Sequence, residues 1–105
     1  MRAGVYNNGI LAGILEKRLD GTYSFEYDEA YLQNDKNLSI SLTLPKRITR
    51  HESDTLFAFF FGLLSEGVNK NIQCRLLKID ENDYFGRLLL TAQEDNIGSI
   101  TVKPL

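Results

Sequence analysis

The segment that decides the fold is "VYNNGILAGIL" (residues 5–15), in which two apolar runs flank Asn7, Asn8 and Gly9. Asparagine and glycine tolerate the positive φ angles of a tight turn, so this segment predicts a β-hairpin. A second turn signal at residues 20–21 precedes "TYSFEY", whose aromatic residues occupy alternate positions: Tyr23, Phe25 and Tyr27. Alternation of this kind is typical of a half-buried strand. We therefore expect the N-terminal part to form a three-stranded antiparallel meander.

Two later segments also alternate like strands. "NLSISLTLP" ends at Pro45 and has an apolar residue at every second position: Leu38, Ile40, Leu42 and Leu44. "GSITVKP" (residues 98–104) alternates Ile100 and Val102 with polar residues, and we expect it to rejoin the sheet as a last strand. Between the meander and the first of these segments, "DEAYLQN" (residues 28–34) predicts a short helix with Asp28 as its N-cap.

The most apolar stretch is "FAFFFGLLSEG" (residues 57–67). It predicts a helix from Asp54 to Glu66, capped by Ser53 and ended by Gly67. Seven apolar side chains would cover an arc of roughly 200°, which is wider than the core of a small domain usually needs: Leu56, Phe57, Phe59, Phe60, Phe61, Leu63 and Leu64. Such a helix is either central to its own domain or partly covered by another protein. We expect Phe57, Phe60 and Phe61 to lie in the core.

Two further amphipathic helices are predicted in the C-terminal half. One begins at Val68, and the other lies within residues 80–93 with Asn82 or Asp83 as its cap. The predicted fold is therefore α+β, with a small antiparallel sheet packed with about three helices. In this sheet a C-terminal strand rejoins the N-terminal meander.

The chain length, net charge and cysteine count are those of one small soluble domain. A chain of 105 residues can bury one hydrophobic core, so we expect a single domain over residues 1–105. The formal net charge of −2 argues against a general nucleic-acid binder, because phosphate contacts need an excess of Lys and Arg. The single cysteine, Cys74, excludes an intramolecular disulfide, and the N-terminus has no signal-peptide pattern. These features favour a cytoplasmic protein without a membrane segment.

No catalytic, metal or cofactor site is predicted. His51 has neither a second His nor a Cys nearby and is interpreted as a solvated loop residue, while Cys74 is interpreted as a partly buried, inert thiol. "DENDYFG" (residues 80–86) has Tyr and Phe where a calcium loop needs an oxygen ligand and a glycine. The glycines form no phosphate-binding loop. We therefore expect a binding or regulatory protein rather than an enzyme.

The order of several weak motifs resembles a known family. "VYNNGILAGIL", "YSFEYD", "LSISLTLP", "FFFGLLSEG" and "DYFGRLLLTAQEDNIGSITVKP" follow one another as comparable blocks do in the N-terminal domain of the HipA family of serine/threonine kinases. In that family the ATP-binding and catalytic segments follow this domain, whereas this chain ends at Leu105. The chain therefore looks like the separate small antitoxins of HipBST toxin–antitoxin systems.

The resemblance implies an antitoxin that binds a HipT-like kinase toxin in trans and inhibits it, in a ternary complex with a HipB-like DNA-binding protein. On this interpretation the residues that reach toward the kinase are those at the end of the aromatic helix: Leu63, Leu64, Ser65, Glu66 and Gly67. The alternative is a DNA-associated regulator that assists the HipB-like repressor through the basic segment 46–51. Its contacts would come from Lys46, Arg47 and Arg50, and no direct specific DNA binding is expected.

Overall fold

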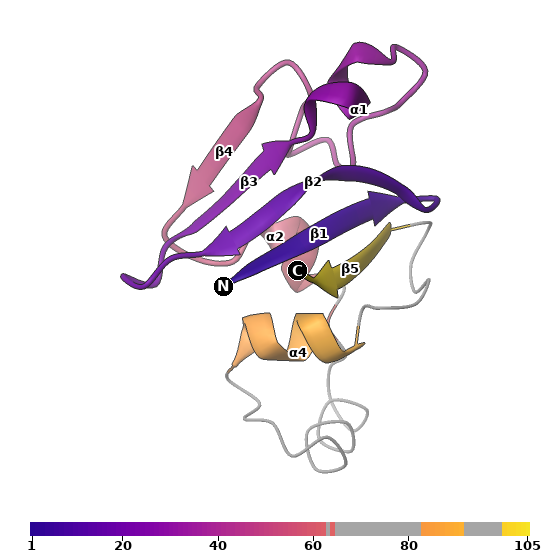
Figure 1. The fold of residues 1–105 in the computed structure, drawn as a ribbon. Helices are drawn as coiled ribbons and strands as arrows, with labels where there is room; N and C mark the ends of the chain where they lie inside the picture. Colours follow the sequence, from indigo (N-terminus) through magenta and orange to yellow (C-terminus); the bar gives the residue numbers. More distant parts are fainter. Residues whose placement is uncertain (63, 65–82, 92–99) are drawn as a thin grey trace.

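The computed structural model describes residues 1–62, 64, 83–91 and 100–105 and contains a five-stranded antiparallel sheet with short helices (Figure 1). The strand order is β4-β3-β2-β1-β5. The elements follow the chain as β1 (Arg2–Asn7), β2 (Ile10–Lys17), β3 (Tyr23–Tyr27), α1 (Glu29–Gln33), β4 (Arg50–Ser53), α2 (Ala58–Phe61), α4 (Tyr84–Thr91) and β5 (Ile100–Pro104). This arrangement confirms the predicted α+β fold.

The N-terminal meander forms as predicted, with its turns at the positions indicated by the turn residues. Asn8 and Gly9 connect β1 to β2 with φ angles of 52° and 79°, which only residues of their kind adopt at low cost. Between β2 and β3, Gly21 has a φ angle of 89°, and the Thr22 amide donates a hydrogen bond of 3.0 Å to the Asp20 carboxylate. Local turn chemistry therefore fixes the register of both hairpins.

The C-terminal strand rejoins the sheet as predicted. β5 pairs antiparallel with β1, and Val5 lies opposite Val102 in the register. Figure 1 shows β1 between β2 and β5, with both chain ends on this side of the molecule. The strand that begins the sequence is thus flanked on both sides.

The two faces of the sheet differ in their side chains. We call the inner face the one that carries the buried residues Val5, Leu15, Phe25 and Val102, and the outer face the opposite one. Helices α2 and α4 pack on the inner face, because the ring of Phe60 lies 5.7 Å from that of Phe25 and the ring of Phe85 lies 6.2 Å from that of Tyr23. The hydrophobic core lies between the inner face and these helices.

The predicted strand "NLSISLTLP" is wrong. Residues 38–44 form a loop with a tight turn, in which Ser41 and Leu44 make an isolated bridge. Ile40 and Leu44 are buried, whereas Leu38 and Leu42 are exposed. The Ser41 hydroxyl is bonded within the turn, to the Thr43 hydroxyl at 2.9 Å and the Thr43 amide at 3.2 Å. Side-chain hydrogen bonds here replace the pairing that an alternating strand would need.

The predicted helix from Asp54 to Glu66 begins too early. Residues 50–53 belong to β4, which pairs with β3, rather than to a connection leading to a cap. The Ser53 hydroxyl accepts a 3.2 Å hydrogen bond from the Thr55 amide in a short turn, and α2 starts only at Ala58 with Phe57 as its N-cap. The residues before α2 are therefore drawn into the sheet.

Of the two residues predicted as the cap of the C-terminal helix, Asn82 and Asp83, the structure shows Asp83 in this role. Its carboxylate accepts a 3.0 Å hydrogen bond from the Gly86 amide, and the next residue, Tyr84, starts α4. Phe85 and Leu88 on this helix are fully buried, as the apolar pattern predicts. The predicted helix from Val68, the cysteine Cys74 and the helix stop at Gly67 lie outside the described residues.

Candidate partner-binding surface

A shallow apolar groove runs beside α2. Its volume is about 450 Å³, and it is lined by Thr43 and Leu44 of the preceding loop and by Leu56, Phe57, Ala58 and Phe61 around the helix. We call this feature the α2 groove. Its lining is mainly apolar, as in surfaces that recognise proteins or small apolar groups.

The helix α2 divides its phenylalanines between the core and the groove. Phe60 is fully buried and contacts the rings of Phe57 and Phe59 edge-on, at 6.2 and 5.2 Å. Phe61 points elsewhere, is 39% exposed and contacts the ring of Tyr84 at 5.1 Å. Placing Phe61 in the core is therefore wrong, because a helix as short as α2 cannot turn all its large side chains inward. Phe61 and Tyr84 together present aromatic surface to solvent.

The loop before β4 adds exposed apolar side chains. Leu42 is 99% exposed and precedes Thr43 of the α2 groove, and Leu38 and Ile48 in the same loop are also exposed. The alternating pattern put Leu42 on the same side of a strand as Ile40 and Leu44, which are buried, so sequence reasoning missed its exposure. Only the contacts that hold the loop reveal its position.

Two stacked tyrosines hold this loop in place. The rings of Tyr27 and Tyr31 lie 6.0 Å apart and nearly parallel. The Tyr27 hydroxyl donates a hydrogen bond to the Leu44 carbonyl and accepts one of 3.1 Å from the Ile40 amide. Burial raises the pKa of the Tyr27 phenol, so the hydroxyl keeps the proton it donates. Satisfied polar groups of this kind specify one loop conformation.

His51 belongs to the same arrangement and is not the solvated loop residue that the sequence predicts. It lies on β4, is half-buried, and its ring meets the Tyr27 ring edge-on at 6.2 Å. Its Nε2 atom lies 3.2 Å from the Pro45 carbonyl oxygen. These contacts give His51 a structural role in supporting the loop.

The basic side chains predicted to contact a partner differ in how many interactions they make within the domain. The Lys46 ammonium donates hydrogen bonds to the carbonyls of Asn34 and Asn37, at 3.2 and 2.6 Å, and lies over the ring of Tyr31. Arg50 is paired with two carboxylates of the outer face. Arg47 is exposed. Two of the three side chains are thus engaged by the protein itself.

The predicted partner-binding residues are described only at Leu64. Its side chain is 6% exposed and belongs to the core cluster, and its amide donates a 3.1 Å hydrogen bond to the Phe61 carbonyl. Leu63, Ser65, Glu66 and Gly67 lie outside the described residues. Of this segment, the structure therefore places Leu64 alone, in the core.

Metal sites and membrane spans were also considered over the described residues. In this part of the chain no three His, Cys, Asp or Glu side chains gather as metal ligands. Among the same residues, no helix has the length and apolar character needed to cross a bilayer.

Comparison with known proteins identifies the family. A family model described as "HipA N-terminal domain" matches residues 3–103. This chain belongs to the HipA N-terminal domain family. The resemblance that the ordered motifs indicated is thereby confirmed at the level of the family.

A solved structure supports this assignment, and a curated protein of unstated function is similar in sequence. The structure described as "N-terminal domain of HipA toxin" superposes with a TM-score of 0.70 and 26% identity, covering 97% of this chain and 90% of that chain. An uncharacterized protein of Haemophilus influenzae is 32% identical over 104 residues, which cover 98% of this chain and 92% of that protein. The two sequences therefore match over nearly the full length of both chains.

Proposed function

We propose that this protein is an antitoxin of the HipS type, a single HipA N-terminal-like domain that binds a HipT-like kinase in trans and inhibits it. The observation that carries the proposal is the α2 groove, an apolar surface formed by described residues of a domain of the HipA N-terminal family. When a domain of this kind is a separate protein, it must recognise its kinase as a partner. Exposed apolar area is then expected on the recognition surface.

The proposed contact surface combines three neighbouring parts. Leu42 at the tip of its turn and Phe61 beside Tyr84 supply the exposed apolar anchors. The segment 63–67 follows Phe61 and Gly62 of the groove and adds polar contacts from Ser65 and Glu66. Buried Leu64 ties this segment to the core. A few aromatic and aliphatic anchors then carry most of the affinity.

Co-expression with the kinase tests this surface. Leu42→Asp places a charge on a side chain that is almost fully exposed, so the fold is retained while an apolar contact is lost. We expect binding of the kinase to weaken about tenfold or more, measured by calorimetry, with a matching loss of growth rescue. Leu19→Asp is the matched control, because Leu19 is equally exposed in the turn between β2 and β3.

Glu66→Arg tests the segment that follows the groove, with circular dichroism to show that the variant is folded. Full neutralisation by both Leu42→Asp and Glu66→Arg would refute the proposed surface. An equal loss in Leu19→Asp would show that the effect is not specific to the groove.

The second candidate function is a DNA-associated regulator acting through segment 46–51. Exposed Arg47 favours it, whereas Lys46 and Arg50 are held by groups of the domain itself. A gel shift with the isolated protein, compared with one that contains the HipB-like partner, separates direct from assisted DNA binding. Salt-sensitive binding by the isolated protein would favour this second function.

A further inference from the structure

The turn between β1 and β2 contains an asparagine followed by a glycine, Asn8 and Gly9. Both residues are exposed, and a Cβ atom added at Gly9 would meet no other atom within 4 Å. Among the described residues, no hydrogen bond involves the Asn8 side chain, and none is donated by the Gly9 amide. The side-chain amide of Asn8 and the backbone nitrogen that follows it are therefore both open to solvent.

The other asparagines of the described residues are held by hydrogen bonds. The side-chain amides of Asn7 and Asn37 donate to the hydroxyl and the carbonyl of Tyr31, at 3.0 and 3.2 Å. The side-chain oxygen of Asn34 accepts a 3.0 Å hydrogen bond from the Lys36 amide. None of these three asparagines is followed by a glycine. In the described part of the chain, a free side-chain amide next to a glycine thus occurs only in the turn between β1 and β2.

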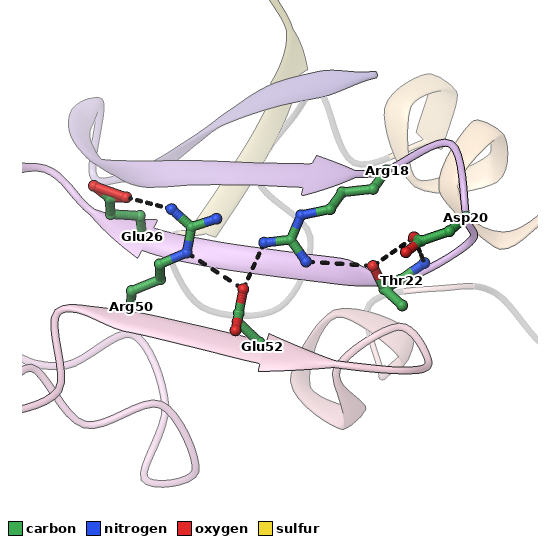
Figure 2. Close-up of polar contacts among 6 residues, drawn as sticks. All are labelled: Arg18, Asp20, Thr22, Glu26, Arg50 and Glu52. Carbon is green, nitrogen blue, oxygen red and sulfur yellow. Dashed lines mark hydrogen bonds and ion pairs between the residues drawn. The ribbon is translucent and has the colours of Figure 1, made fainter.

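The turn between β2 and β3 offers a comparison within the molecule, because Asp20 precedes Gly21 there. Figure 2 shows the Asp20 carboxylate beside Thr22, whose hydroxyl and amide donate hydrogen bonds of 2.7 and 3.0 Å to it. The bond from the Thr22 hydroxyl lowers the pKa of the Asp20 carboxyl and keeps it ionised. The Gly21 amide donates a 3.0 Å hydrogen bond to the Arg18 carbonyl. Here both the carboxylate and the following backbone nitrogen are engaged.

We propose that Asn8 is a site of spontaneous modification, at which the side-chain amide is lost through an imide formed with Gly9. The Gly9 backbone nitrogen attacks Cγ of Asn8 and closes a ring, the bond from Cγ to Nδ2 breaks, and Nδ2 leaves as ammonia with the proton of the Gly9 amide. Water then opens the imide at one of its two carbonyls. Opening at Cγ gives aspartate, whereas opening at the backbone carbonyl gives an isoaspartyl linkage. Asparagine is a labile residue, and glycine gives the backbone the freedom that ring closure needs.

The two products differ in their consequences for the fold. Aspartate tolerates the positive φ angle of position 8 and keeps the two-residue turn that joins Asn7 to Ile10 in the register. An isoaspartyl linkage adds a carbon atom to the main chain of this turn, so the register is strained. Asn7 then loses the position from which it reaches Tyr31, whose hydroxyl donates to the Leu38 carbonyl. Modification of the turn therefore loosens the loop that follows α1, and this inference does not rest on the proposed antitoxin function.

The test is ageing of the purified protein in mildly alkaline buffer, followed by peptide mass spectrometry. We expect conversion of amide to acid at Asn8, with isoaspartate among the products, at a rate that rises with pH because the attacking nitrogen must lose its proton. Asn7, Asn34 and Asn37 should react more slowly, since hydrogen bonds hold them. The urea midpoint of the protein should fall on ageing. In Asn8→Gly, which suits the turn, conversion at this position should be lost and the midpoint should stay constant.

A second variant separates the new charge from the new linkage. Asn8→Asp carries the aspartyl product without the isoaspartyl one, so the fresh variant should unfold at a higher urea concentration than the aged protein. Amide loss at Asn7, Asn34 and Asn37 as fast as at Asn8 would overturn the proposal, because the structure would then select no site. Equal isoaspartate formation at Asp20, or an equal fall of the urea midpoint in aged Asn8→Gly, would also overturn it.

Discussion

The inner and outer faces of one sheet have opposite chemistry, although the same five strands form both. On the inner face Val5, Leu15, Phe25 and Val102 have no exposed surface and pack under α2 and α4. On the outer face Arg18, Arg50 and Glu52 keep much of their surface in water. The inner face therefore supplies the free energy that holds the fold, whereas the outer face tolerates change and is available for recognition.

The largest expected effect of this difference is on stability, in a comparison of two adjacent phenylalanines. Phe60→Ala empties a fully buried site against Phe25 and should lower the free energy of unfolding by about 3–5 kcal/mol. Phe61→Ala removes a side chain that is partly in solvent, and about 1 kcal/mol or less is expected. Urea unfolding followed by circular dichroism measures both. Similar losses for the two variants would contradict the division of α2 between core and groove.

The same substitution on each face gives the next test. A Cβ atom at Gly13, on the inner face, would lie inside 3.0 Å of the Glu26 carbonyl oxygen and 2.7 Å from the Phe25 ring, so Gly13→Ala should cost about 1–3 kcal/mol. At Gly4, on the outer face, the nearest atom is 3.0 Å away in the ring of Tyr6. That ring can move outward, so Gly4→Ala should cost less. Thermal unfolding of both variants checks the order, and a reversed order would refute it.

A smaller expected effect is the dependence of stability on pH, which differs between the two faces. Burial raises the pKa values of the Tyr23 and Tyr27 phenols above 10.0, the value expected in the unfolded chain. Their contribution to stability is complete below pH 10 and is lost as the pH rises toward their folded pKa values. The urea midpoint should therefore fall above about pH 10, and Tyr27→Phe should reduce this fall. An unchanged alkaline profile in Tyr27→Phe would argue against the burial of this phenol.

On the outer face stability is lost as the pH falls, rather than as it rises. The hydrogen bond and charge of Arg18 lower the pKa of the Glu52 carboxyl below 4.5. Its contribution is present above pH 4.5 and is lost as the pH falls through the lowered pKa. Because the Glu52 side chain is 60% exposed, we expect the acid change to be slight, and Glu52→Gln is the variant that should abolish it. A large acid change that disappears in Glu52→Gln would show a stronger outer face than we infer.

The parts of the fold that local chemistry determines were predictable. The turn at Asn8 and Gly9 needs positive φ angles, and the sequence supplies the residues that adopt them. The same holds for Asp83, whose carboxylate caps α4. In both cases the deciding contact is made within three residues along the chain.

The sequence-based predictions were wrong where contacts between distant residues determine the local structure. "NLSISLTLP" alternates like a strand, but hydrogen bonds from Tyr27 and Tyr31 hold it as a loop. "RHES" of β4 has no β-branched residue and no Phe, Tyr or Trp, and its pairing with β3 is visible only in three dimensions. The exposure of Leu42, and with it the rim of the α2 groove, follows from the same long-range bonds.

The position of β1 has a consequence for the time course of folding. β1 and β2 are neighbours in the chain and can pair early, but the other edge of β1 pairs with residues 100–104, across most of the sequence. Closing so long a loop is slow compared with forming a hairpin. During synthesis the edge of β1 that pairs with β5 therefore stays open until residues 100–104 emerge. During this interval the unpaired edge of β1 can pair with a wrong strand, and a chaperone that covers β1 would reduce such mispairing.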